Sequence, residues 1–257
     1  MAPSTPQATP GGSGPGRREQ NRRARERAYL DAAMAIAITD GLRELTMTRL
    51  AASVEAAVGT VYTYFPSKGA LVAELQREAI ERLTASYHLL RDRSEPLLTT
   101  WDDPGRAAVA RLATFGSFWI ATMETFPQES ALLHGLISES QILVPPEERH
   151  RVIPTALALL DEARQVVVEA RDLGALEPGE PIEAVVRLAA GLTGVLLTRN
   201  IGQGSPIIIE PARLATDLQR DLLRGWGATP EALAAADRHV AVLAGQGPLA
   251  PPIAEPG

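Results

Sequence analysis

The chain has 257 residues, of which 45% are hydrophobic and 22% are charged, and its formal net charge is −6. These proportions are ordinary for a globular protein, and the length suffices for one large domain or two smaller ones. No cysteine is present, which excludes disulfides and thiolate metal sites. No apolar run is long enough to predict a membrane span, and the N-terminus lacks the apolar core of a secretion signal. We therefore expect a cytoplasmic protein without a membrane partner.

Charge is distributed unevenly along the chain. Residues 1–16 are rich in Pro, Gly, Ser and Thr, which predicts a disordered tail. Residues 17–69 then hold nine Lys/Arg and six Asp/Glu, a net charge of +3 that leaves −9 for the remainder. Six arginines are concentrated at the start of this segment: Arg17, Arg18, Arg22, Arg23, Arg25 and Arg27. Alone, such a run is typical of a solvated helix start, but ahead of a DNA-binding motif it indicates an arm that contacts phosphates.

Apolar periodicity and capping signals predict helices over nearly all the chain after residue 20. The first carries Tyr29, Ala33 and Ile36 on one face and ends at Asp40-Gly41; a short second helix follows Thr46 as its N-cap. The third is expected at Val58–Phe65, and a fourth, capped by Ser67, at about 68–90. After a loop at 93–104, further helices are predicted at about 106–125, 128–140, 147–173, 181–200, 211–225 and 230–244. The only strand-like run, residues 207–209, is too short to indicate a sheet.

The segment from Val58 to Lys68 combines the features that a DNA-recognition helix requires. Small and hydroxyl-bearing residues share a short helix with aromatic residues, and a Pro-Ser stop follows. Lys68, the single lysine in a chain with 24 arginines, begins the next helix. Such a helix can lie in the major groove of DNA while phosphate contacts hold it there.

Residues 22–75 resemble the DNA-binding domain of the tetracycline-repressor (TetR) family of bacterial transcription regulators. The family pattern G-T-[LV]-Y-x-[HY]-F-x-[ST]-K and the preceding residues match without gaps over about fifty positions. The matching residues are Leu30, Ala32-Ala33, Gly41, Thr46, Leu50-Ala51, Gly59-Thr60-Val61-Tyr62, Tyr64-Phe65, Ser67-Lys68 and Leu71. The resemblance implies an all-α fold, in which a three-helix helix-turn-helix domain precedes a larger helical domain that binds a ligand and dimerises.

The candidate DNA contacts lie on the second and third helices and at the start of the fourth. Gly59 would let the backbone approach DNA closely, and Tyr62 would place its ring on sugar and its hydroxyl on phosphate. Val58 could contact a thymine methyl group, whereas Val61 and Phe65 are assigned to the core. The full set is Thr46, Arg49, Val58, Gly59, Thr60, Tyr62, Thr63 and Lys68.

The turn before the third helix departs from the family pattern. Family members usually have a Gly-Val-Ser-like tripeptide where this chain has Glu55, Ala56 and Ala57. A glutamate in a left-handed position costs about 1–2 kcal/mol, and the loss of a serine cap costs about 0.5–2 kcal/mol. Either the turn has another geometry or the domain is locally less stable, and Ala57→Ser should raise the melting temperature.

The resemblance also implies a small-molecule pocket within the fourth to seventh helices. Aromatic residues are only 4% of the chain, yet several gather near residues 115–126. As a set they indicate a pocket for an apolar or aromatic ligand, although ordinary core is the better interpretation for any single one. The candidate ligand-binding residues are Tyr87, Phe115, Phe118, Trp119, Met123, Phe126 and His134.

A homodimer is the second implication for the larger domain. Ala189, Ala190, Gly191 and Gly194 indicate close helix approach within residues 181–200. Leucines 214, 218 and 222 form a stripe on the next helix that the family precedent assigns to a dimer interface rather than to the core of one chain. A dimer would place two recognition helices on the half-sites of a pseudopalindromic operator.

The sequence thus predicts four regions: a disordered tail at 1–16, the helix-turn-helix domain at 17–66, the ligand-binding and dimerisation domain at 67–245, and a second tail at 246–257. The expected function is that of a regulator, most simply a repressor, which a small apolar or aromatic molecule releases from double-stranded operator DNA. The ligand would do so by favouring a conformation in which the two DNA-binding domains no longer match the groove spacing.

Two other classes of protein are compatible with parts of the sequence. An enzyme finds little support, because the four histidines lack metal-ligand spacing and neither a nucleophile elbow nor a phosphate loop is present. The acidic pairs Glu147-Glu148 and Asp161-Glu162 are interpreted as solvated helix faces, and no cofactor or metal is expected. The second alternative is an all-helical ligand-binding or interaction protein that has lost specific DNA binding, which the unusual turn at residues 55–57 would favour.

Overall fold

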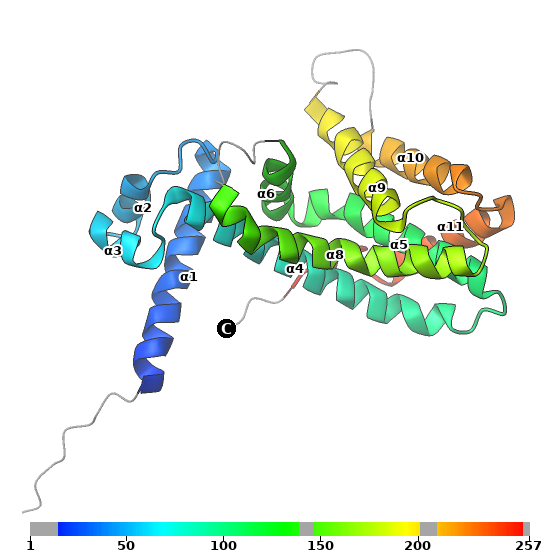
Figure 1. The fold of residues 1–257 in the computed structure, drawn as a ribbon, viewed down its shortest axis with the longest axis horizontal. Coiled ribbons are helices and arrows are strands. Elements are labelled where there is room, and N and C mark those ends of the chain that lie inside the picture. The colour runs from blue at the N-terminus through cyan, green and yellow to red at the C-terminus, as the bar shows by residue number, and fades with distance from the viewer. Residues whose placement is uncertain (1–14, 139–145, 201–209, 254–257) are drawn as a thin grey trace, which may run out of the picture. The chain divides into compact units, whose positions relative to one another are not determined.

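The computed structural model of the protein describes residues 15–138, 146–200 and 210–253. Within these ranges the chain is helical and contains no β-strand, which confirms the predicted all-α class (Figure 1). The strand-like run at residues 207–209 lies outside the described ranges. The chain divides into two compact units, residues 1–71 and residues 72–257. None of the helices in the described ranges combines the length and the apolarity needed to cross a bilayer.

The first unit is a three-helix domain built from α1 (Pro15–Asp40), α2 (Met47–Ser53) and α3 (Val58–Tyr64), followed by the first residues of α4 (Lys68–Leu98). The predicted caps are confirmed: the Thr46 hydroxyl accepts from the Arg49 amide at 3.1 Å, and the Ser67 hydroxyl accepts from the Ala70 amide at 2.9 Å. Apolar side chains from every helix form the core: Leu30, Ala33, Leu45, Leu50, Val61, Phe65 and Leu71.

The turn between α2 and α3 is a complete Schellman motif with a glutamate in the place that glycine usually takes. Glu55 lies at φ 53°, its amide donates to the Ala52 carbonyl at 3.3 Å, and the Ala56 amide donates to the Ala51 carbonyl at 2.9 Å. Ala57 is the N-cap of α3 and supplies no side-chain hydrogen bond. Of the two possibilities left open by the sequence, the structure therefore shows the usual geometry with an unfavourable residue in it.

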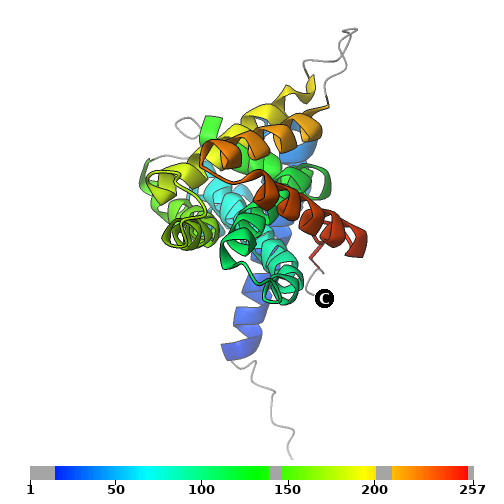
Figure 2. The ribbon, with the colours of Figure 1, turned by 90° about the vertical axis from the view of Figure 1, so that its right-hand side faces the viewer.

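The second unit packs its helices around α5 (Pro104–Thr125). α8 (Pro146–Asp172), α9 (Pro181–Leu196), α10 (Pro211–Gly225) and α11 (Pro230–Gln246) all contact α5. α6 (Pro127–Ser138) follows α5 directly, and α9 continues into a short 3₁₀ turn at Leu197–Asn200. Figure 2 looks nearly along α4, α5 and α8, with α10 and α11 beside them.

Proline at the first position explains why the helix starts in this unit lie within two residues of their predicted positions. α5, α6, α8, α9, α10 and α11 all begin at a proline. The fixed φ of proline suits the first turn, and its missing N–H would have no partner there. Asp103 and Thr229 add side-chain caps to α5 and α11.

The end of α4 is where the predicted boundaries were wrong. The sequence predicted that this helix ends near residue 90 and that a loop spans 93–104, but α4 continues to Leu98. Tertiary contacts explain the extension: Leu98 is fully buried, the Ser94 hydroxyl lies 2.8 Å from Nε2 of His239 on α11, and Glu95 binds Arg111 on α5. Pro96 is accommodated inside the last turn.

The C-terminal tail predicted from residue 246 also differs in its described part. Residues 247–253 pack beside α4, where the Ser86 hydroxyl donates to the Pro251 carbonyl at 2.7 Å and Arg93 donates to the Pro248 carbonyl at 2.8 Å. Ala250 is fully buried. Proline and glycine in this segment prevent a helix, but its carbonyl groups and alanine side chain still have partners in the fold.

Candidate functional site

One face of α3 is attached to the first unit and the other is open to solvent. Val61 and Phe65 are buried, as predicted. At the end of α3, Tyr64 packs edge-on against Tyr29 of α1, with 5.0 Å between the ring centroids. On the opposite side Tyr62 is 49% exposed, and Thr63 is exposed beside it. The predicted contact residues of α3 thus lie away from the core, with Val58 and Thr60 half-buried at its edge.

Gly59 lies on the open side of α3, and the packing of the described residues does not require a glycine there. A β-carbon added at this position would meet no other described residue within 4 Å. A glycine inside a helix costs about 1 kcal/mol relative to alanine, so its presence calls for a reason outside the packing of the domain. The close approach of the α3 backbone to DNA, predicted from the sequence, remains our interpretation of Gly59.

Two predicted DNA contacts, the N-cap of α2 and a residue on that helix, also have structural roles. The hydroxyl oxygen of Thr46 accepts the capping hydrogen bond, while its hydrogen remains able to donate to a phosphate. Arg49 is 44% exposed but binds Asp40 at 2.5 Å and lies 3.9 Å from Glu44. A phosphate would therefore have to compete with two carboxylates for this guanidinium.

Lys68 is positioned as the sequence predicts, at the first residue of α4. Its ammonium donates to the Arg43 carbonyl at 3.0 Å, which uses one of its three donors. Burial lowers the pKa of Lys68, and the nearby Glu44 carboxylate opposes this shift. An anion beside the ammonium would favour its charged form further.

In the second unit, most of the predicted ligand residues form a packed aromatic cluster. Tyr87 on α4 lies 5.2 Å from Phe115 and 5.3 Å from Phe118, and Phe115 lies 5.9 Å from Trp119. All four side chains are buried, and the Trp119 indole donates to the Thr193 hydroxyl at 3.0 Å. For these residues the alternative interpretation as core describes the observed packing, since the rings fill space against one another.

The remaining three predicted ligand residues lie at or beyond the end of α5. Met123 is half-buried, and Phe126 is buried at the C-cap position of α5. His134 is on α6, but its side chain is outside the described part of the structure.

A small cavity opens beside the aromatic cluster, between α4, α5 and α8. Its volume is about 40 Å³, and Tyr87 is the one predicted ligand residue in its wall. The other lining residues were not predicted, and most are charged or hydroxyl-bearing: Arg91, Ser94, Glu95, Arg111, Thr114, Glu162 and Val166. Burial and then the Glu162 charge raise the pKa of the Tyr87 hydroxyl, which therefore stays protonated.

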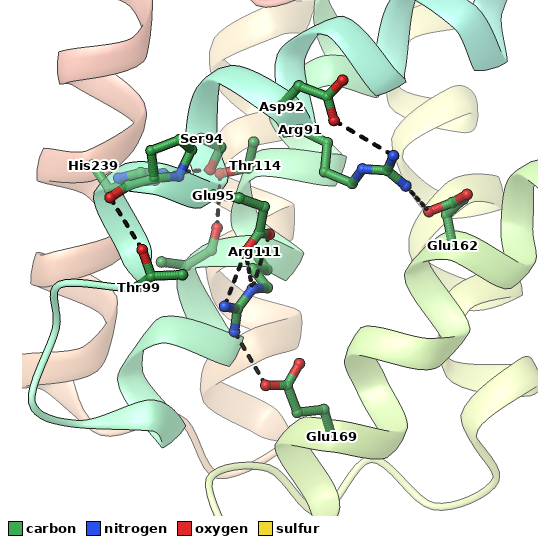
Figure 3. A network of polar contacts seen from close by, with 12 residues as sticks. Arg91, Asp92, Ser94, Glu95, Thr99, Arg111, Thr114, Glu162, Glu169 and His239 are labelled. Atoms are coloured by element: carbon green, nitrogen blue, oxygen red, sulfur yellow. Dashed lines mark hydrogen bonds and ion pairs between the residues drawn. The ribbon is translucent and has the colours of Figure 1, made fainter.

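Two ion-pair networks surround this cavity (Figure 3). Arg91 on α4 binds Glu162 on α8 at 2.9 Å. Glu162 also lies 3.0 Å from His88. Arg111 on α5 binds Glu95 at 2.9 Å and Glu169 on α8 at 3.1 Å. The hydrogen bonds that Arg111 donates to the Glu95 carboxylate raise the pKa of Arg111 against the effect of burial.

These networks correct the interpretation of Glu162 as part of a solvated face. No spacing in the sequence indicated them, because each joins residues far apart in the chain. The available signal is indirect: Arg91 and Glu95 lie one turn apart on α4, which places both charges on one face, but each binds a residue of another helix.

A wider cleft of about 570 Å³ lies elsewhere in the second unit, between the α4–α5 loop and α11. Trp101 forms one wall and contacts the ring of His239 edge-on, with 5.8 Å between ring centroids. Arg106 and Arg238 also line it. Among the described residues no group of histidines and carboxylates could hold a metal ion.

Comparisons with known proteins bear mainly on the first unit. A family profile described as "Bacterial regulatory proteins, tetR family" matches residues 30–75. The HTH-type transcriptional repressor KstR of Mycolicibacterium smegmatis is 40% identical over 63 residues, which are 24% of this chain and 31% of that protein. The chain therefore matches about a third of the length of this curated relative. The residues that the family profile matches include α2, α3 and the start of α4.

Solved structures extend the likeness to both units at the level of the fold. A TetR transcription regulator from Haloarcula marismortui has a TM-score of 0.58 at 16% identity, over 79% of this chain and 98% of that one. FadR from Bacillus subtilis, a transcriptional regulator in complex with stearoyl-CoA, has a TM-score of 0.54 at 17% identity, over 77% of this chain and 97% of that one.

Proposed function

Because this chain belongs to the tetR family of bacterial regulatory proteins, we propose that it regulates transcription by binding double-stranded DNA as a homodimer and responding to a small molecule. The observation that carries the proposal is the open face of α3, where Gly59, Tyr62 and Thr63 are exposed opposite a buried attachment. A regulator of this kind would act in the cytoplasm, beside the chromosome.

DNA recognition is assigned to α3, with support on either side. Tyr62 and the threonines would meet base edges and sugar-phosphate in the major groove. Thr46 and Lys68 would bind DNA phosphates on the two sides of α3, and the backbone amides at the start of α4 would assist the lysine. In a dimer, two such helices about 34–36 Å apart would read successive major grooves of a pseudopalindrome.

The dimer interface is assigned to the outer side of α9 and α10. Gly191 faces Leu218 within the same chain, since a β-carbon at Gly191 would lie 3.2 Å from the leucine side chain. That contact uses part of the expected leucine stripe inside the monomer. Val186, Leu197 and Leu214 remain 46%, 51% and 38% exposed. Burial of such apolar side chains against a second copy would stabilise a dimer.

The effector is assigned to the cavity beside Tyr87. The wall combines an aromatic ring with two arginines and two glutamates, which favours a small aromatic molecule with polar substituents over a purely apolar one. At about 40 Å³ the cavity has to expand to admit it, and separation of the Arg91–Glu162 pair would provide the space. Because α4 carries both Lys68 and Arg91, an effector that binds a shifted α4 more tightly would lower affinity for DNA, as expected of a repressor.

DNA binding is tested by titrating the protein, at several salt concentrations, against a duplex from the region flanking its own gene and against a scrambled duplex. Specific affinity should fall steeply with salt. Lys68→Ala should lower the slope of log K against log salt by about one per bound protomer, and Tyr62→Ala should weaken specific binding. Arg171→Ala, which removes one exposed cation from the second unit, is the matched control and should leave the slope unchanged.

The outcomes separate the alternatives. Equal affinity for both duplexes, or none, would favour an all-helical ligand-binding or interaction protein that lacks specific DNA recognition. If Lys68→Ala leaves both the salt slope and the specificity unchanged, the lysine does not contact DNA, but the proposed DNA-binding function still holds.

The effector site is tested by thermal shift with benzene derivatives that differ in one substituent: methyl, hydroxyl, carboxylate or ammonium. Polar members should raise the melting temperature most, and Tyr87→Phe, which keeps the ring and removes the hydroxyl, should reduce that effect. Trp101→Ala is the control for the wider cleft. A response lost in Trp101→Ala and kept in Tyr87→Phe would move the effector to that cleft.

A further inference from the structure

One stripe of α1 is basic and exposed near the start of the helix and apolar and buried further along it. Residues 18, 22, 25, 29, 33 and 36 follow one another at intervals of four, three, four, four and three, which places them on a single helix face. The last three, Tyr29, Ala33 and Ile36, are buried in the first unit. The first three are Arg18, Arg22 and Arg25, and all are exposed.

The stripe continues past the body of the domain on the side where α3 is attached. Tyr29, the residue that follows the arginines on this face, contacts Tyr64 at the end of α3. Figure 1 shows the first turns of α1 extending beyond α2 and α3. Among the described residues of the first unit, the arginine part of the stripe therefore has no apolar surface to cover.

The arginines of the stripe differ from their neighbours in their partners. Arg23 binds Glu19 at 3.1 Å and Arg27 binds Asp31 at 3.0 Å, each one turn away on the same helix. Arg18, Arg22 and Arg25 form no ion pair or hydrogen bond with any described residue. Like charges three and four residues apart on a helix repel one another, so this arrangement disfavours the isolated helix and favours a polyanion beside it.

We propose that Arg18, Arg22 and Arg25 form a phosphate-binding face that extends the DNA contact of α3 along the duplex. Seven residues of helix span about 10 Å, and phosphates of one strand recur about every 3.4 Å along the DNA axis. Three guanidinium groups can therefore each reach a separate phosphate, with the paired geometry that arginine favours. Such contacts raise affinity for any DNA and leave sequence discrimination to α3. The inference rests on the proposed function.

The experiment compares two double variants that remove the same charge from the same helix. Arg22→Gln/Arg25→Gln alters the unpaired stripe, and Arg23→Gln/Arg27→Gln alters the paired residues. Both are measured against the upstream duplex and its scrambled counterpart over a range of salt. Each lost phosphate contact lowers the salt slope by about 0.9, so the stripe variant should lose about 1.8 per bound protomer, equally on both duplexes. The control should lose less than half of that, and circular dichroism should show unchanged helix content for both.

Each outcome has a distinct meaning. Equal losses in the two variants would show that only net charge matters and would overturn the phosphate-binding face, while specific binding by the wild type would still uphold the proposed function. A wild type that binds neither duplex overturns both. If the stripe variant keeps its DNA slope but loses binding to vesicles of phosphatidylserine and phosphatidylcholine, the face serves a membrane and the inference fails.

Discussion

Replacing Glu55 by glycine should stabilise the protein by relieving the backbone at the turn before α3. Glu55 lies at φ 53°, a region that costs a residue with a β-carbon about 1–2 kcal/mol. Relief of this strain by glycine is partly offset, by about 0.4–1 kcal/mol, because glycine has greater conformational freedom in the unfolded chain. The glutamate side chain is exposed and forms no ion pair or hydrogen bond with a described residue, so the substitution removes no contact there. The expected gain is about 1 kcal/mol, on the scale of these two effects.

Thermal unfolding followed by circular dichroism measures this gain. One kcal/mol shifts the melting temperature by about 4–8 °C for a domain of 60–100 residues and by about 2–4 °C for one of 150–250 residues. The larger shift is expected if the first unit unfolds separately. Glu55→Ala is the matched control, because it removes the same carboxylate and keeps the β-carbon, and it should change the melting temperature little.

Two results would refute the reasoning. If Glu55→Ala stabilises as much as Glu55→Gly, the cost arises from the carboxylate and not from the backbone. If Glu55→Gly lowers the melting temperature, the left-handed glutamate is held without strain, and the explanation of the turn given above is wrong.

Three other substitutions test separate parts of the fold. Ala57→Ser should raise the melting temperature, because a serine hydroxyl at this N-cap can accept from the Thr60 amide for about 0.5–2 kcal/mol; no rise would mean that residue 57 does not act as the cap. Burial lowers the pKa of His239 below its ordinary value of 6.5, so the unfolded chain binds a proton more readily and stability should fall as pH drops below about 6.5. Melting temperatures at pH 7.5 and 5.5 should differ less in His239→Gln than in the wild type, and an equal difference would assign the pH dependence to other groups. Gly116→Ala places a β-carbon where it would overlap the buried Gln219 amide. The overlap costs about 1–3 kcal/mol, of which the better helix propensity of alanine offsets about 1 kcal/mol, so the second unit should lose up to about 2 kcal/mol. A chemical denaturation midpoint equal to or above that of the wild type would show that the amide moves aside freely.

The first unit was predictable because its signals are local. The caps Thr46 and Ser67, the breaks at Gly41 and Pro66, and the alternation of buried and exposed residues on α3 all lie within a few residues of what they determine. The start of each later helix was predictable for the same reason, since a proline marks it. Local signals failed at the end of α4, where helix continues through Pro96 because α5 and α11 supply partners for residues 94, 95 and 98.

The candidate site divides in the same way. The face of α3 could be assigned from the sequence, since one helix presents all of its residues. The cavity could not, because its wall is made of side chains from three helices. The rarity of aromatic residues correctly marked where they gather, but it did not reveal that Tyr87, Phe115 and Phe118 contact one another. The Arg91–Glu162 pair joins residues 71 positions apart, a distance over which a single sequence carries no pairing information.

The sequence by itself determined the all-α class, the recognition helix and the unfavourable glutamate before it, since each depends on neighbours in the chain. It also determined the arginine stripe of α1, which follows from spacing alone. Only the tertiary structure decided which charges have partners: Arg23 and Arg27 are paired, whereas Arg18, Arg22 and Arg25 are not. The physical reason is that an ion pair requires two groups within about 4 Å, and only the folded chain sets the distances between its side chains.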